Sequence, residues 1–221
     1  MKFDFARDGD VFLQAIGTTL YIVATAIGVG GVVGLVLGVT LFISRKGGLR
    51  PNAFVFNLLN VLINFFRPIP FIIFVAAMGP LTLAVVGSSI GTNAFIFPAA
   101  LMVSFASARL VEQSLVGLDP GVVEAARSMG ASTWTIIRTV VIPEALAPLI
   151  LAYTFLFVAV VDMSALAGIV AGGGLGAFAL SYGYQRFDWT ITWITVAVIV
   201  LLVQSVQYLG NWLARKALHR G

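Results

Sequence analysis

The chain has 221 residues, of which 60% are hydrophobic and 10% are charged, and its formal net charge is +4. Soluble domains carry about 25% charged residues, so this composition excludes an ordinary globular domain and a disordered chain, and it predicts an all-α integral membrane protein. The chain has no cysteine, and its one histidine is His219, so we expect neither an enzyme nor a metal site. The 13 Lys and Arg residues are scattered, which argues for membrane lipid and against nucleic acid as a partner.

Five apolar segments are long enough to cross a bilayer, so we expect five transmembrane helices in a single domain over residues 1–221. The first, uncharged from Val11 to Ser44, is too long for a signal-peptide core and is expected to remain as a span. The glycines and proline around Gly79–Pro80 divide the next uncharged run into two spans. The expected positions of the four later spans are 54–78, 90–111, 145–168 and 189–213.

The basic residues predict how the chain is oriented in the membrane. With five spans, Lys2, Arg7 and Arg186 fall on one face, and Arg67 is unassigned. The opposite face receives Arg45, Lys46, Arg50, Arg109, Arg127, Arg138, Arg215, Lys216 and Arg220. Because basic loops stay in the cytoplasm, we expect the N-terminus outside and the C-terminus in the cytoplasm.

The segment 112–144 between the third and fourth spans is long and patterned for a loop. Asp119–Pro120 is a strong helix start, and the helix is expected to end at Gly130. A second helix, capped by Ser132 or Thr133, is expected to end at Pro143. These two short amphipathic helices are interpreted either as a docking element for a soluble partner or as a plain hairpin resting on the bilayer.

One run in this segment resembles the EAA loop of permease subunits of bacterial ABC importers. That loop has glutamate–alanine–alanine, a glycine after three further residues, and, nine residues later, isoleucine, any residue, leucine and proline. Here Val140 and Ile142 replace the isoleucine and leucine by side chains of similar volume. The resemblance implies that the residues coupled to an ATPase are Glu124, Ala125, Ala126, Gly130, Ile142 and Pro143.

Two further segments resemble the methionine-uptake permeases within this group. Phe66–Ile73, with Arg67, Pro68 and Pro70, is similar to their signature at the second span. The segment after the fourth span is similar to their glycine-rich run and tyrosine pair, with Gly172, Gly173, Gly174 and Gly176 followed by Tyr182 and Tyr184. The resemblance extends over nearly the whole chain.

The resemblance implies a homodimer in the bacterial inner membrane that imports methionine or a related amino acid. Two ATP-binding subunits would dock on its cytoplasmic loops, and an extracytoplasmic substrate-binding protein would deliver the substrate. ATP and magnesium would bind to the partner ATPase, so this chain would need no cofactor. Consistent with this, Gly172–Gly176 lacks the lysine and the serine or threonine of a phosphate-binding loop.

The residue types of the EAA run suit a helix that packs into a groove. Ala125, Ala126 and Gly130 are small enough for close approach, and Glu124 is able to meet a basic residue or a helix N-terminus. Rigid-body movement of such helices would carry ATPase closure to the attached spans.

Asp162 lies within the fourth span, where a carboxylate costs roughly 2.5–3.5 kcal/mol unless it meets water or a partner. Asp162 and Ser164 are interpreted as lining the substrate pathway, where Asp162 would meet an ammonium group. The alternatives are an ion pair with Arg67 and a protonated carboxyl group. Pro68 and Pro70 interrupt helix hydrogen bonding beside Arg67, which indicates a pathway or gate, with a snorkelling arginine at a kink as the alternative.

The glycines of the first and fourth spans receive different interpretations. Gly172–Gly176, with Tyr182 and Tyr184, predicts as a cluster a re-entrant loop near the external mouth of the pathway, although close helix packing explains any single glycine slightly better. The spacing Gly30–Gly34–Gly38 predicts a close helix–helix contact and no role with substrate.

Two other functional classes are alternatives to the importer. A stand-alone ion-coupled secondary transporter or channel normally shows intramembrane charge networks and inverted repeats. Five spans do not divide into two such repeats, and one acid with one arginine is not a network. A membrane enzyme is disfavoured because the spans contain no histidine and no cysteine.

Overall fold

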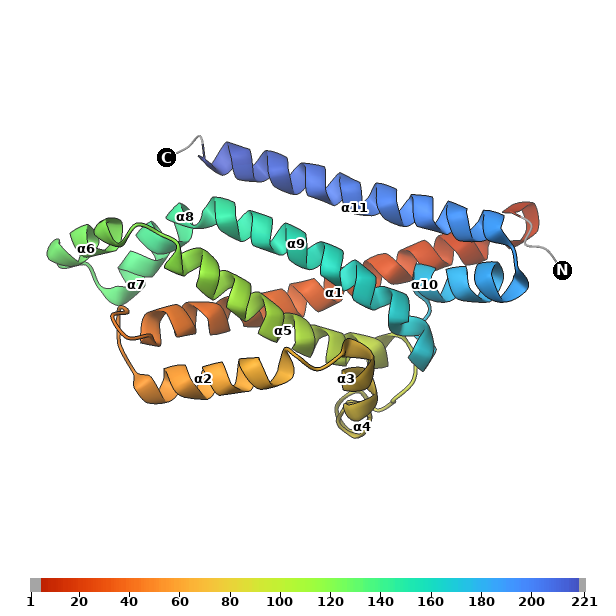
Figure 1. The fold of residues 1–221 in the computed structure, drawn as a ribbon, viewed down its shortest axis with the longest axis horizontal. Helices are drawn as coiled ribbons and strands as arrows, with labels where there is room; N and C mark the ends of the chain where they lie inside the picture. Colours follow the sequence, from red (N-terminus) through yellow and green to blue (C-terminus); the bar gives the residue numbers. More distant parts are fainter. Residues whose placement is uncertain (1–4, 219–221) are drawn as a thin grey trace.

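Helices cover the five apolar segments, and the second segment is divided between two of them. The computed structural model describes residues 5–218, and side chains from residue 8 onward. The long helices are α1 (Phe5–Ser44), α2 (Ala53–Phe66), α5 (Thr92–Val116), α9 (Leu146–Ser164) and α11 (Trp189–Leu218). They run roughly along the long axis of the molecule (Figure 1), and the part of the chain that the structure describes contains no strand, which confirms the all-α class.

Shorter helical pieces connect the long helices. The α-helical ones are α3 (Phe71–Ala77), α4 (Gly79–Val86), α6 (Pro120–Ser128), α7 (Thr133–Ile136), α8 (Ile142–Glu144) and α10 (Gly174–Phe178). Two segments, Ala165–Val170 and Tyr184–Arg186, are 3₁₀-helices, and two, Ile137–Val141 and Ala179–Gly183, are π-helices.

The expected span over 54–78 is broken at the prolines beside Arg67, as the sequence indicated. The axes of α2 and α3 differ by 103°, so α1, α5, α9 and α11 are four spans by length and hydropathy, and a fifth exists only if the bent pair counts as one. Pro68 and Pro70 cause the break, because neither residue has an N–H to continue the hydrogen bonding of α2. Regular helix resumes at Phe71.

The packing of α1 against α5 is the most extensive in the bundle, and glycines make it possible. A Cβ atom on Gly30, Gly34 or Gly38 would overlap the backbone carbonyl of Ala100, Ser104 or Ala108, respectively. The predicted close contact of this glycine series is therefore confirmed.

The two ends of the bundle carry different structures (Figure 1). We call them the α6 end, where α6, α7 and α8 lie, and the α10 end, where α10 and the 3₁₀-helix of residues 165–170 lie. Helix α1 begins at the α10 end, and α11 finishes at the α6 end. Few side chains of α11 are buried, so most of its surface faces lipid or another protein.

Candidate functional site

The predicted caps of the α6 segment are present in the structure. The Asp119 side chain accepts a hydrogen bond from the N–H of Gly121 at 2.8 Å, and of the two predicted caps of the next helix, Ser132 is the one used. Gly130 has φ +76°, its N–H bonds the carbonyl of Arg127 at 2.9 Å, and the next N–H reaches back to Ala126. This hydrogen-bond pair and the positive φ form the helix stop that favours glycine.

Two expected boundaries of this segment need correction. Glu112 does not open the loop, because α5 continues to Val116 and buries Glu112. Pro143 does not end the second helix either: the π-helix Ile137–Val141 leads into α8 and then α9, with Pro143 in the first turn of α8. The wider π turn precedes a proline that lacks an N–H, so the helical path bends there and continues.

Helix α6 sits firmly on the bundle through one of its alanines. Ala126 is only 3% exposed and belongs to a cluster with Val111, Leu115 and Ile136. The guanidinium of Arg127 donates to the carbonyl of Gly48 at 2.7 Å, which ties α6 to the turn between α1 and α2. Ala126 therefore contacts the chain's own core, which corrects the expectation that it faces a partner.

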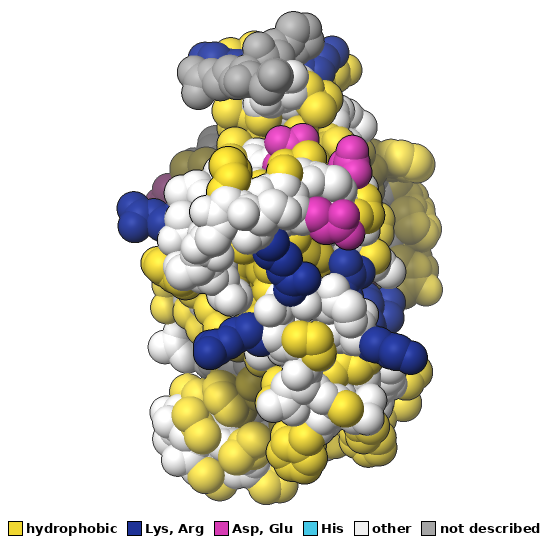
Figure 2. Space-filling model, turned by 90° about the vertical axis from the view of Figure 1, so that its left-hand side faces the viewer, with side chains coloured by type: hydrophobic (Ala, Val, Ile, Leu, Met, Phe, Trp, Pro, Cys, Tyr) yellow, Lys and Arg dark blue, Asp and Glu magenta, His cyan; other side chains and the backbone are white. Residues whose placement is uncertain are grey.

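The opposite face of the α6 segment is open. Glu124 and Ala125 are exposed, and the exposed fractions of Met129 and Trp134 reach 80% and 69%. Figure 2 shows this end of the molecule, where Lys and Arg side chains lie among hydrophobic and uncharged ones. Ile142 is half-buried against the same core, and Pro143 is exposed. An exposed Met and Trp on a rigidly seated helix form a surface suited to a protein partner.

The pathway residues expected around the α2–α3 break and in α9 lie apart. Arg67 and Pro68, with Asn64, line a hollow of about 320 Å³ at the end of α2. Pro70 is the residue immediately before α3. Asp162 is exposed on α9, and among the residues that the structure describes it forms no ion pair with Arg67.

Ser164 and the glycine segment are engaged in local packing. Ser164 is 3% exposed and donates to the carbonyl of Val161 at 2.6 Å. Gly173 and Gly174 have φ +74° and +88°, where a side chain would be strained. A Cβ on Gly172 or Gly176 would press on the backbone of Ala167 or Ala165. The glycines thus let residues 165–178 fold back on themselves as a compact turn at the α10 end.

The two tyrosines after this turn lie in different surroundings. Tyr182 stacks on Phe178 with ring centroids 4.9 Å apart, and Arg186 lies 4.5 Å above its ring. Tyr184 is 60% exposed and meets Trp189 edge-on. Only Tyr182 lines a hollow with Gly173 and Gly174, one of about 220 Å³.

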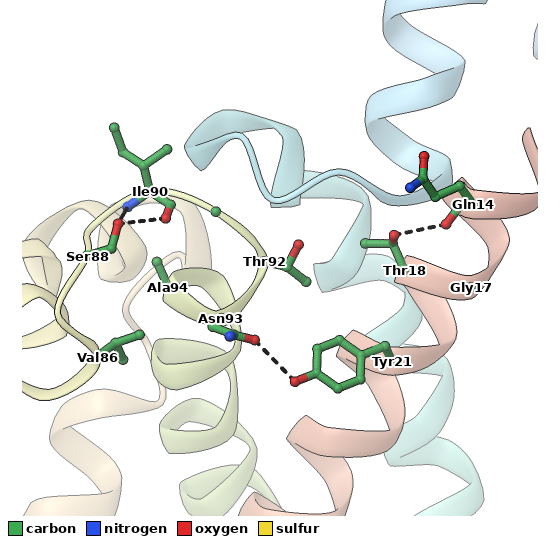
Figure 3. Close-up of a pocket in the computed structure, with 11 residues that line it drawn as sticks. Gln14, Gly17, Thr18, Tyr21, Val86, Ser88, Ile90, Thr92, Asn93 and Ala94 are labelled. Carbon is green, nitrogen blue, oxygen red and sulfur yellow. Dashed lines mark hydrogen bonds between the residues drawn. The ribbon is translucent and has the colours of Figure 1, made fainter. Parts of the chain in front are cut away.

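A larger polar hollow at the α10 end was not anticipated from the sequence. It has a volume of about 750 Å³ and lies between α1 and the loop before α5 (Figure 3). The Tyr21 hydroxyl donates to the side-chain oxygen of Asn93 at 3.1 Å across it, and Gln14 and Thr18 lie on the same side as Tyr21. In the sequence, this hollow is indicated only by the spacing of Gln14, Thr18 and Tyr21 along α1. That pattern is weak in a helix with so many apolar residues.

Hydrogen bonds with two threonine hydroxyls hold the glycine turn beside this hollow. The hydroxyl of Thr92 donates to the carbonyl of Gly172 at 2.9 Å, and that of Thr19 accepts from the N–H of Leu175 at 2.8 Å. Helices α1 and α5 thereby position the glycine turn from both sides.

A charged cluster near the α6 end was also missed. Arg109 forms an ion pair with Glu112 and donates to the side-chain oxygens of Asn60 at 2.7 Å and Asn64 at 3.0 Å. The side chains of Arg109 and Glu112 are 16% and 9% exposed. The cluster links α5 to α2 through polar groups, beside the apolar contacts of Ile63 and Phe66.

Comparison with known proteins gives consistent matches over this fold. A "Probable D-methionine transport system permease protein MetI" of Vibrio cholerae is 42% identical over 216 residues, covering 98% of this chain and 96% of the relative. The "Methionine import system permease protein MetP" of Bacillus subtilis is 39% identical over 173 residues, 77% of each chain.

A solved chain from an inward-facing conformation of the MetNI methionine ABC transporter superposes with a TM-score of 0.90 at 35% identity, covering 94% of this chain and 96% of that one. Residues 30–219 match the family described as "Binding-protein-dependent transport system inner membrane component". With this match over most of its length, the chain belongs to the family of binding-protein-dependent transport system inner membrane components.

Proposed function

We propose that the chain is the permease subunit of an ABC importer for methionine or a closely related amino acid. The relatives named as methionine permeases cover nearly the whole chain, and the chain's fold closely matches the permease of the MetNI transporter. ATP hydrolysis belongs to a separate subunit, so this chain supplies the path and the docking surface, and it binds neither ATP nor magnesium.

The observation that carries this proposal is the two-sided α6 segment. Ala126 is buried against the bundle while Met129 and Trp134 are exposed, so a force on the open face moves the bundle and not only a loop. Two ATPase subunits would dock on the α6 segments of two copies of this chain. In this proposal the α6 end faces the cytoplasm, and the α10 end faces outward toward a substrate-binding protein.

The substrate path is proposed to run between two copies of the chain. Arg67 and the exposed Asp162 offer polar side chains, and Pro68 and Pro70 leave backbone carbonyls of α2 without helix partners; such groups need water or protein beside them in a membrane. The glycine turn with Tyr182 is proposed to shape the external mouth. Ser164 supports this region from behind, since its hydroxyl is already bonded within α9.

The test is reconstitution of the complex from the same genome: this chain, its ATPase and its binding protein in proteoliposomes. We expect uptake of labelled methionine that requires ATP inside and the binding protein outside. Uptake by this chain alone, driven by an ion gradient, would establish the alternative of a stand-alone secondary transporter.

Substitution of Asp162 tests the path itself. Asp162→Asn keeps a hydrogen-bonding group and removes the charge, so uptake is expected to fall at least about tenfold, matching the loss of a charge-assisted hydrogen bond of about 1.5–3 kcal/mol. Detergent stability of the complex should not change. Unaltered uptake would remove Asp162 from the path. A double variant Asp162→Asn/Arg67→Gln more stable than both single variants would instead indicate an ion pair between copies.

A further inference from the structure

Helix α2 carries a polar stripe along one face. Asn57, Asn60, Asn64 and Arg67 follow one another at spacings of three, four and three residues, so their side chains lie on the same side of the helix. The other residues of α2 are apolar, and an adjoining face exposes Phe54, Leu58 and Phe65, each more than half exposed. The helix is therefore two-faced, with one side suited to lipid or apolar protein and one suited to water.

The stripe descends from the α6 end toward the middle of the bundle. At 1.5 Å per residue, Asn60 lies about 10 Å and Arg67 about 21 Å along the helix from Ala53. The full distance of about 21 Å exceeds the hydrocarbon thickness of one leaflet, which is about 15 Å, so the stripe reaches well into the membrane. Asn57, Asn64 and Arg67 are exposed in the single chain, and such groups do not face lipid at this depth without a large cost.

Helix α5 holds the stripe in place from behind. The guanidinium of Arg109 binds the side-chain oxygens of Asn60 and Asn64, and Glu112 balances its charge. With these oxygens turned toward Arg109, the NH₂ groups of the two asparagines point away from it as hydrogen-bond donors. A buried ion pair that orients two amides in this way is a positioning device for the α2 face.

The inner end of the stripe combines donors and an acceptor around a hollow. Arg67 contributes a planar fork of N–H donors, which suits a carboxylate. Pro68 has no N–H for the carbonyl of Asn64, four residues earlier, so this carbonyl is able to accept from an ammonium group. Asn64, Arg67 and Pro68 together line the hollow of about 320 Å³, which is large enough for the α-amino and α-carboxyl groups of an amino acid.

From these observations we propose that the Asn57–Asn60–Asn64–Arg67 face of α2 lines a water-filled cytoplasmic half of the translocation path, and that Asn64 and Arg67 bind the α-carboxylate and α-ammonium groups of the departing substrate. The proposal rests on the proposed function, because it takes the α6 end as cytoplasmic. The substrate class is a zwitterionic amino acid, recognised here by its backbone groups and not by its side chain.

Single cysteines test this face directly, because the chain has none of its own. Asn57→Cys and Asn64→Cys are compared with Leu58→Cys and Phe65→Cys on the apolar face of the same helix, in the complete transporter in inside-out vesicles. A charged, membrane-impermeant methanethiosulfonate is the probe. We expect the two stripe cysteines to react at least about tenfold faster than the two control cysteines, since thiolates form and react in water and not in hydrocarbon. Excess methionine added outside the vesicles, on the cytoplasmic face, should slow the reaction at position 64.

A functional pair of variants completes the test. Asn57→Leu removes a polar group that does not contact Arg109, so it leaves the α2–α5 link intact; we expect methionine uptake to fall at least about threefold. Leu58→Val, on the apolar face, is the matched control and should keep normal uptake. If the wild-type complex imports methionine but stripe and control cysteines react equally slowly, the inference is wrong while the importer assignment stands. If the wild-type complex imports no amino acid, the importer assignment fails first.

Discussion

Glycines have different structural roles at different places in this chain. Gly34 faces a carbonyl and a serine of α5 at a distance that leaves no room for a methyl group, whereas Gly28, one and a half turns earlier, has nothing near it. Gly130 is needed for its φ of +76° and not for space. The sequence predicted the roles of Gly34 and Gly130. A four-residue glycine spacing is typical of a close helix–helix contact, and a glycine at the end of an amphipathic helix is typical of a helix stop.

The α1–α5 contact predicts a sharp contrast between two alanine substitutions. Gly34→Ala forces a Cβ into Ser104 and Ser107, so we expect it to destabilise the protein by about 1–3 kcal/mol, as overpacked cores do. Gly28→Ala lies on the same helix in open space and should be neutral or slightly stabilising. Thermal unfolding in detergent measures both, and equal melting temperatures would contradict the close-packing interpretation.

For the helices, the caps and stops were predictable from the sequence, whereas the packing of one helix against another was not. The caps at Asp119 and Ser132 and the stop at Gly130 were foreseen, because each depends on residues within one turn. The apolar stripe of α6 did not reveal that Ala126 faces inward and Met129 outward, since that depends on where α5 ends. The asparagine spacing of α2 was visible in the sequence, but its partner Arg109 is 45 residues from Asn64 and is brought there only by the fold.

The open face of the α6 segment makes a prediction about assembly. Trp134→Ala and Met129→Lys remove or charge the two most exposed apolar side chains of this segment, so we expect the ATPase to co-purify at least about tenfold less well, a loss of about 1.4 kcal/mol or more. Leu180→Lys, on a side chain 51% exposed at the other end of the bundle, is the matched control and should retain the ATPase. Normal co-purification of both α6 variants would place the docking surface elsewhere.

At the scale of the whole molecule, the fold explains why five expected spans become four straight helices and one bent pair. Composition and charge-free length identify apolar segments, but they do not say whether an apolar segment crosses in one piece. Pro68 and Pro70 are compatible with a kinked span and with a turn of 103°, and the choice is made by packing of α3 and α4 against α5. A broken span is tolerated only where protein or water covers the freed backbone, which is consistent with a path beside it.

The orientation of the chain in the membrane is a prediction that depends on its basic residues, its helices and its whole fold. Helix α1 starts at the α10 end and α11 finishes at the α6 end, so the α6 segment and the basic turn between α1 and α2 must share one side of the membrane. Because basic turns stay in the cytoplasm, an impermeant maleimide added to intact cells (spheroplasts if the organism has an outer membrane) should label Ser181→Cys and not Lys46→Cys. Both positions are exposed, and the chain has no other cysteine, so each signal reports one site. Labelling of Lys46→Cys should appear only after the cells are opened. The reverse pattern would put the α6 segment outside, away from any ATPase, and would contradict the docking surface and the importer assignment together.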